Sequence, residues 1–210
     1  MISPLALELS AGLGVTAGLG LAAGGFAYAS LWPASQLFGP SLIAPPRPGE
    51  LALTFDDGPN PLWTPRLLDL LSRRGVRATF FLVGSRAQSH PALVRQILAA
   101  GHCIGNHSWS HRNLAMAPSS TIEDQLSRTN QTLAEITGAP PRFFRPPYGA
   151  RRPATLAIAR RLGLTPVLWN AMTSDWKNPS ADRAPSVAAA AQLIARYQPT
   201  HQFVTLDAWA

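Results

Sequence analysis

The sequence predicts an α/β domain with a mostly parallel β-sheet, preceded by a hydrophobic N-terminal helix. Beyond Glu50, short apolar runs alternate with stretches that have helical periodicity, a pattern typical of β/α folds. Polar, turn-forming motifs end or follow several of the apolar runs. Catalytic side chains of such folds lie at the carboxyl ends of the strands, so we expect the functional residues there.

The N-terminal stretch predicts a membrane anchor over residues 1–32. No charged residue lies between Leu9 and Trp32, and this stretch exceeds the roughly 20 residues that a helix needs to cross a bilayer. No Lys or Arg precedes it, so its sequence sets no orientation. Residues 27–29 resemble a small-x-small cleavage site, which makes a removed signal peptide the alternative. Prolines then punctuate residues 33–49, which predicts a linker.

The strands are predicted at the short apolar runs, and the helices at the longer segments with helical periodicity. In the helix expected at 121–137, Ser120 and Glu123 form the pattern of a capping box, and Gly138 supplies a stop. The predicted strands are 51–55, 78–82, 103–106, 143–145, 166–169 and 203–206. The predicted helices are 64–74, 91–100, 121–137, 153–162 and 187–197.

Two adjacent carboxylates, Asp56 and Asp57, follow the first predicted strand. Gly58 and Pro59 then stop the strand and allow a turn. We therefore expect both carboxylates at a loop edge where a substrate can reach them. Taken alone, the same pattern suits an ordinary solvated turn.

Two histidines, His107 and His111, lie four residues apart after the predicted strand 103–106. Their imidazoles can converge on one cation if the backbone turns helically. A histidine pair alone is weak evidence for a metal site. Together with an Asp from another strand end, however, it supplies the mixed nitrogen and oxygen ligands of a catalytic zinc-like site that keeps a position open for water.

The composition limits the kinds of binding partner that we expect for this protein. A formal net charge of +7 and a pI near 11.0 favour anionic surroundings, such as a membrane surface or an acidic cell wall. The Arg residues are scattered, and no basic run with interleaved aromatics is present, so no nucleic-acid partner is predicted. Cys103 is the single cysteine, which excludes an intrachain disulfide.

Four segments together resemble motifs of the polysaccharide deacetylase family, also called carbohydrate esterase family 4 or the NodB-homology domain. The resemblance runs from about Glu50 to Ala181. It implies a distorted, incomplete (β/α) barrel formed by residues 50–210, with a metal at its top. The matching segments are TFDDGP at 54–59, HSWSH at 107–111, RPPYG at 145–149 and SDW at 174–176.

The resemblance also implies the roles of the first two motifs. Asp57, His107 and His111 are expected to bind a divalent metal, Zn²⁺ or Co²⁺ in preference to others. Asp56 is expected to be the general base. The alternative for Asp56 is a structural turn cap.

The third and fourth motifs complete the expected site. Arg145 is expected to hold Asp56, and Asp175 to hold Arg145, although a structural salt bridge is the alternative for that pair. Tyr148 is expected to stabilise the oxyanion through its backbone N–H. Trp176 and Trp109 are expected to form an apolar wall for the acetyl methyl or a sugar face, and both also suit a plain core.

The family's fifth motif, a strand that ends in a general-acid histidine, has no match here. Ala208 stands where that histidine might follow the last apolar run, and His201 precedes the run. From about Arg183 the chain departs from the family pattern. We therefore hypothesise a truncated or frame-shifted C-terminus.

The predicted function is a metal-dependent hydrolase that removes N-acetyl groups from N-acetylglucosamine units of peptidoglycan or a chitin-like oligosaccharide. We expect it at the cell membrane, with the catalytic domain on the extracytoplasmic side or, after signal cleavage, secreted. The alternative is an envelope-anchored, non-catalytic carbohydrate-binding protein that lost the general acid. A misassembled product that does not fold stably is the third possibility, because a missing closing strand would expose the edge of the first strand.

Overall fold

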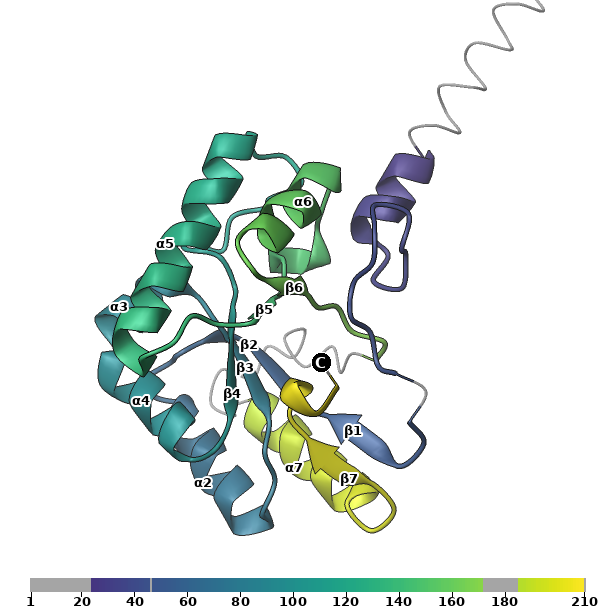
Figure 1. Ribbon diagram of the computed structural model, residues 1–210. Coiled ribbons are helices and arrows are strands. Elements are labelled where there is room, and N and C mark those ends of the chain that lie inside the picture. Colours follow the sequence, from purple (N-terminus) through teal and green to yellow (C-terminus); the bar gives the residue numbers. More distant parts are fainter. Residues whose placement is uncertain (1–23, 46, 172–184, 210) are drawn as a thin grey trace, which may run out of the picture.

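The computed structural model describes residues 24–45, 47–171 and 185–209 (Figure 1). Its centre is a five-stranded parallel sheet with the strand order β2-β3-β4-β5-β6, and a separate two-stranded sheet pairs β1 with β7. The structure therefore confirms a parallel-sheet α/β fold. The strands are β1 Glu50–Ala52, β2 Thr54–Gly58, β3 Thr79–Leu82, β4 Cys103–Asn106, β5 Phe143–Phe144, β6 Thr165–Pro166 and β7 Gln202–Val204.

The first predicted strand is divided at Leu53 into β1 and β2, which belong to different sheets. The backbone carbonyl of Leu53 accepts a hydrogen bond from the N–H of Thr79 at 3.0 Å, so the chain changes partner from β7 to β3 at this residue. The apolar pattern runs unbroken through the change, because both halves contact apolar clusters: Ala52 packs against one, and Leu53 and Phe55 pack against another. The sequence therefore gave no sign of the division.

The helices cover the outside of the sheet (Figure 1). Gly138 ends α5 in a left-handed conformation, with a φ of 86°, as predicted. The predicted capping box is wrong: α5 begins earlier than expected, Pro118 is its N-cap, and no side chain caps it. The short helix α3 was not predicted. The helices are α2 Thr64–Arg74, α3 Gly84–Ser89, α4 Pro91–Ala99, α5 Ser119–Thr137, α6 Pro153–Arg161 and α7 Pro185–Tyr197.

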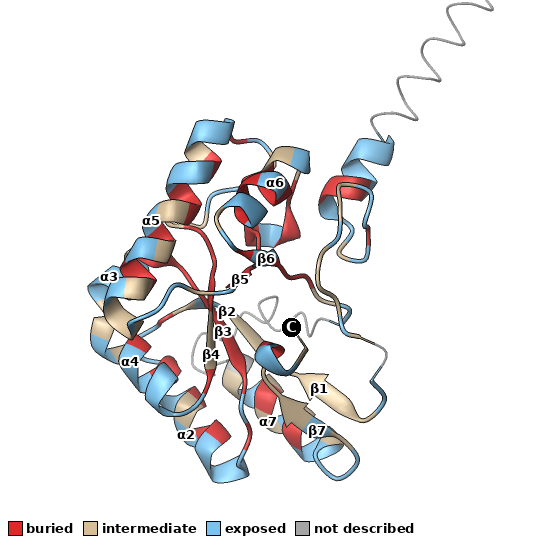
Figure 2. Cartoon of the chain, in the orientation of Figure 1, coloured by how far each residue is buried: buried red, intermediate tan, exposed pale blue. Residues whose placement is uncertain are grey.

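The core lies between the sheet and these helices (Figure 2). Every residue of β3 is buried, as expected for a parallel strand that is covered on both faces. One apolar cluster joins β3 to α2, α4 and α7, and a second joins β5 to α5 and α6. This packing fixes the carboxyl ends of β2, β4 and β5, where the candidate site lies.

The C-terminal segment supplies a strand next to β1. Glu50, Leu51 and Ala52 pair in parallel with Gln202, Phe203 and Val204. Ala190 and Ile194 of α7 are buried in the same cluster as the apolar face of α2. β7 therefore covers the edge of β1, while β2 stays at the end of the five-stranded sheet.

The segment predicted as a linker lies against the domain. Leu42 forms a parallel bridge with Val167: its N–H donates to the carbonyl of Pro166 at 2.8 Å, and its carbonyl accepts from the N–H of Leu168 at 3.0 Å. Residues 24–31 are helical. Most of the predicted anchor falls on residues 1–23, which lie outside the described residues. Within the described ranges, no helix has the length and apolarity needed to cross a membrane.

Candidate metal and catalytic site

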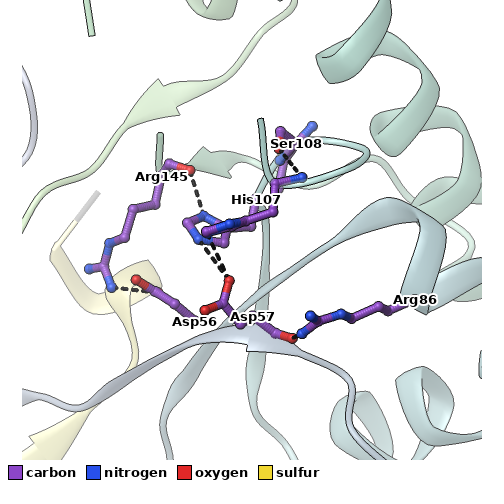
Figure 3. Close-up of polar contacts among 8 residues, drawn as sticks. Asp56, Asp57, Arg86, His107, Ser108 and Arg145 are labelled. Atoms are coloured by element: carbon purple, nitrogen blue, oxygen red, sulfur yellow. Dashed lines mark hydrogen bonds and ion pairs between the residues drawn. The ribbon is translucent and has the colours of Figure 1, made fainter. Parts of the chain in front are cut away.

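Strand β2 presents its two carboxylates to different partners (Figure 3). Its pairing with β3 shifts register between Phe55 and Gly58, and Asp57 has a left-handed φ of 65°. Asp57 consequently faces the histidines, while Asp56 faces Arg145. We predicted both carboxylates on a turn after the strand; they lie within β2, at this irregularity.

The imidazoles of His107 and His111 converge on Asp57. Oδ1 of Asp57 lies 2.9 Å from Nε2 of His111 and 3.5 Å from Nε2 of His107. The turn between the histidines is not helical, since Ser108 and His111 have positive φ values of 64° and 55°. The hydroxyl of Ser108 accepts a hydrogen bond from the backbone N–H of His111 at 3.1 Å, which holds this turn.

Two residues that sequence reasoning missed support the site. Oδ1 of the buried Asn106 accepts from the N–H of Ser108 at 2.7 Å, and its Nδ2 donates to the carbonyl of Leu126 at 2.9 Å. Arg86 on α3 donates from Nη1 to the backbone carbonyl of Asp57. Asn106 could have been found from the sequence, because it is a polar residue at the end of an apolar strand. No feature of the sequence pointed to Arg86.

The donor set fits a divalent metal ion. One ligand atom from each of Asp57, His107 and His111 lies within 4.8 Å of the others. Nδ1 of His107 lies 2.7 Å from the carbonyl oxygen of Arg145, so this nitrogen is the donor and Nε2 keeps its lone pair. A carbonyl on the far nitrogen of a metal-binding imidazole is the usual way in which such a ligand is oriented.

The pKa values of Asp57 and His107 favour the forms that bind a metal. Burial opposes ionisation of Asp57, but the hydrogen bond from His111 and the positive charges of both histidines and Arg86 outweigh it, so its pKa is lowered. Burial lowers the pKa of His107, against the opposing charges of Asp56 and Asp57. A carboxylate and a neutral imidazole are the states that bind metals.

Arg145 holds Asp56 from a buried position. Its Nη1 donates to Oδ1 of Asp56 at 2.8 Å and to Oγ1 of Thr54 at 2.7 Å. Its Cζ lies 4.2 Å from the ring centroid of Phe81. The buried Nε has no hydrogen-bond partner among the described residues. Asp175, the residue expected to hold Arg145, lies outside the described residues, as does Trp176.

The remaining predicted residues lie on either side of the triad. Tyr148 is 63% exposed, and its ring meets that of His111 edge-on, with 4.6 Å between the centroids. Trp109 lies on the α5 side, where the Cζ of Arg128 is 3.8 Å from its ring centroid. A Cβ on Gly84 would lie 2.6 Å from the Trp109 ring. The substrate-contacting roles of both aromatics stay predictions.

The described C-terminal segment brings no imidazole to the triad. Strand β7 ends at Val204, opposite Ala52, before the chain reaches the level of Asp56. The buried Leu206 then donates its N–H to Oγ1 of Thr79, at the start of β3. His201 precedes β7, and its Nδ1 lies 2.8 Å from Oγ1 of Thr200, at the opposite end of the strand from the carboxylates.

The site combines one carboxylate with two converging imidazoles, and a second carboxylate beside them is bound by an arginine. All of these groups lie at the strand ends of a parallel sheet. Together they define the class of hydrolytic α/β proteins with a metal-binding triad. Comparison of the sequence with known protein families identifies the family. The chain belongs to the polysaccharide deacetylase family, whose model matches residues 44–167.

Two curated relatives illustrate the range of the family. The chain is 44% identical over 133 residues to a peptidoglycan-N-acetylglucosamine deacetylase of Bacillus cereus, a match that covers 63% of this chain and 48% of the relative. It is 37% identical over 140 residues to a chitooligosaccharide deacetylase of Bradyrhizobium, covering 66% of this chain and 64% of the relative. The chain thus matches about half to two thirds of the length of these proteins.

Two solved structures resemble the fold. A peptidoglycan N-acetylglucosamine deacetylase in complex with an N-oxidanyl-benzamide has a TM-score of 0.74 and 35% identity, over 78% of this chain and 89% of that one. A carbohydrate esterase family 4 pseudoenzyme from Bacillus anthracis has a TM-score of 0.70 and 27% identity, over 76% of this chain and 64% of that one.

Proposed function

We propose that this protein is a metal-dependent deacetylase that hydrolyses N-acetyl groups of N-acetylglucosamine units in peptidoglycan or a chitin-like oligosaccharide. The observation that carries the proposal is the division of labour on β2. Asp57 joins the two imidazoles, while its neighbour Asp56 is bound by Arg145. The named activities of the relatives support this substrate class.

A bound metal, Zn²⁺ or Co²⁺ in our proposal, would polarise the acetyl carbonyl and acidify a water molecule. Asp57, His107 and His111 would hold it. Asp56, positioned by Arg145 at 2.8 Å, accepts a proton from the attacking water. The backbone N–H of Tyr148 stabilises the charge that develops on the carbonyl oxygen.

The leaving nitrogen needs a proton when the carbon–nitrogen bond breaks. Among the described residues, the carboxyl of Asp56 is the acid available at the site, since it carries the proton taken from water. A separate general acid typically contributes about 10²- to 10⁴-fold to the rate. We therefore expect slower turnover than in family members that have the fifth-motif histidine.

The residues around Asp56 leave room for a sugar. The described residues enclose a cavity of about 1060 Å³ whose wall includes Asp56, Arg145, Trp63, Asn60 and Trp169. Aromatic faces and amide groups are suited to a pyranose ring, which has apolar faces and a polar edge. We propose that this cavity receives the sugar that carries the acetyl group.

The test is acetate release from N-acetylglucosamine oligomers and from peptidoglycan, with added Zn²⁺ or Co²⁺ and with a chelator control. Asp57→Ala should lose metal and activity together, whereas Asp56→Asn should keep the metal and lose activity. Asp69→Asn is the matched control, because Asp69 is an exposed carboxylate of α2 that pairs with Arg73. Full turnover by Asp56→Asn would refute the assignment of the base.

The second candidate function is that of a non-catalytic carbohydrate-binding protein of the cell envelope. It is favoured by the early end of β7 at Val204 and by the existence of a pseudoenzyme with a similar fold. A folded, metal-loaded protein that binds the oligomers and releases no acetate would establish this function instead. Acetylated xylan should be assayed in parallel, because an ester substrate would also release acetate.

We also propose attachment to the cell membrane, with the domain on the extracytoplasmic side, where the proposed substrates occur. The uncharged stretch from Leu9 to Trp32 supports the attachment. Secretion after cleavage of a signal is the alternative. Membrane fractionation followed by N-terminal sequencing of the mature protein separates the two.

A further inference from the structure

Exposed apolar side chains gather in one short segment before the domain. Five of the nine large hydrophobic residues that are exposed in the described ranges lie between residues 26 and 37. We call them the aromatic patch: Phe26, Tyr28, Leu31, Trp32 and Leu37. Concentrated apolar exposure of this kind marks an interaction surface.

The aromatic patch has a defined shape. Tyr28 and Trp32 stack with 6.2 Å between their ring centroids, and the ring of Phe26 lies 5.4 Å from that of Phe38. Most of the helix at 24–31 is exposed and projects beside the domain (Figure 2). Only Ala29 and Ser30 at its end are buried.

One buried arginine attaches this segment to the domain. Arg151 is fully buried, and it donates to the backbone carbonyls of Ser30 at 3.3 Å, Trp32 at 2.8 Å and Ser35 at 2.8 Å. Its Nη1 also donates to the carbonyl of Gly149 at 3.1 Å. The guanidinium therefore joins the segment that carries the patch to the loop that carries Tyr148.

The chemistry of the segment selects a lipid bilayer as its partner. No charged residue occurs between Glu8 and Arg47, whereas protein partners usually meet a polar, charged rim around an apolar centre. Tyr and Trp are enriched where a protein crosses from lipid to water, because one end of each ring is apolar and the other polar. The uncharged residues 9–23 lead directly into the patch.

We propose that the aromatic patch inserts into the headgroup region of a bilayer, and that Arg151 fixes the catalytic domain to it in one orientation. The patch thus begins within the uncharged stretch from Leu9 to Trp32, continues to Leu37, and is the part of that region that Arg151 holds to the domain. The proposal does not depend on the deacetylase activity, since its test measures lipid contact alone.

The test places the full chain in vesicles of phosphatidylglycerol and phosphatidylethanolamine whose acyl chains are brominated near the headgroup. Bromine quenches tryptophan emission on contact. Trp32→Phe keeps the backbone carbonyl that Arg151 binds and an apolar ring, but removes the emission of this site. Trp63→Phe is the matched control, because Trp63 is a partly exposed tryptophan that precedes α2, away from the patch.

If the patch lies in the interface, the bromine-sensitive part of the emission is present in the wild-type protein and in Trp63→Phe. It is lost in Trp32→Phe. Equal quenching of all three proteins would overturn the proposal, even if the N-terminal residues bind the vesicles. Absence of quenching in all three would also overturn it, and sedimentation would then show whether the patch pairs two copies of the chain.

Discussion

Nδ1 of His107 lies 2.7 Å from the backbone carbonyl oxygen of Arg145. The side chain of the same arginine binds Asp56 at 2.8 Å. One residue thus positions an imidazole of the proposed metal site through its main chain and the proposed base through its side chain. Substitution of the side chain should separate these two effects.

Arg145→Lys should retain the metal and lose activity. A lysine keeps the carbonyl that binds His107, but its ammonium cannot stack on Phe81 as the planar guanidinium does. The nitrogen that contacts Thr54 and Asp56 therefore loses its fixed position. Misplacement of a catalytic group by about 1 Å can reduce the rate by about 10²-fold, and we expect a loss of this size in kcat. Metal content and acetate release should be measured on the same sample, and loss of the metal would contradict the prediction.

Backbone strain predicts an unusual order of stability at position 148. Tyr148 has a φ of 60°, a conformation that costs a non-glycine residue on the order of 1–3 kcal/mol. Because its side chain is largely exposed, packing contributes little. Tyr148→Gly should therefore be more stable than Tyr148→Val by about 1–2 kcal/mol.

Urea unfolding of the two Tyr148 variants measures this difference directly. The same pair of substitutions at Leu98, an exposed residue of α4, is the control, and there the glycine should be the less stable variant. Equal stability of the two variants at position 148 would argue against strain in this loop.

Acid sensitivity should come in part from His102. Burial and the charge of Arg77 lower its pKa below the ordinary 6.5, and its Nδ1 accepts a hydrogen bond from the N–H of Ala78 at 3.2 Å. The unfolded chain binds the proton more readily than the folded one. This contribution to stability is therefore complete above about pH 6.5 and is lost as the pH falls through the folded pKa.

His102→Asn tests this contribution, because asparagine keeps an acceptor for Ala78 and does not titrate. The drop in Tm between pH 8 and pH 5 should be smaller in the variant than in the wild type. Both proteins should be measured with a chelator, so that acid release of a metal from His107 does not enter the comparison. An identical drop would remove His102 from the explanation.

Loss of the Arg151 guanidinium should release the N-terminal segment. Arg151→Met leaves the carbonyls of Ser30, Trp32 and Ser35 without their donor, and an unsatisfied buried acceptor destabilises the structure around it. Amide hydrogen exchange should accelerate in residues 24–38, while the buried strand β3 keeps its protection. Unchanged exchange in residues 24–38 would show that other contacts hold the segment.

Much of the fold could be predicted because its elements follow local rules. β4 at Cys103–Asn106 and α2 at Thr64–Arg74 have the predicted bounds, since both are bordered by turn residues. The division at Leu53 could not be predicted, because it depends on which strand pairs with each half. The capping box at Ser120 failed because α5 starts at Ser119, directly after Pro118, so that Ser120 already lies inside the helix.

The candidate site could be predicted as a set of residues and not as a geometry. Spacing indicated two imidazoles and an aspartate as cation ligands, and the choice of Asp57 over Asp56 came from the resemblance to the family. It could not show the positive φ values at Asp57, Ser108 and His111, which are imposed by tertiary contacts. The contacts of Arg86 and Arg151 with backbone carbonyls could not be predicted from the sequence. Every residue has a backbone carbonyl, so no residue type marks the partner.

The attachment of the N-terminal segment by Arg151 bears on which acetyl groups the protein could reach. An enzyme on a flexible tether samples a volume whose radius grows with the length of its linker. Here Leu42 and Ser35 are held against the domain, so the distance between the aromatic patch and Asp56 is constant. If the patch docks on lipid as proposed, the protein would work at one fixed height above the bilayer and modify a thin layer of polymer, whose depth is set by the protein's own dimensions.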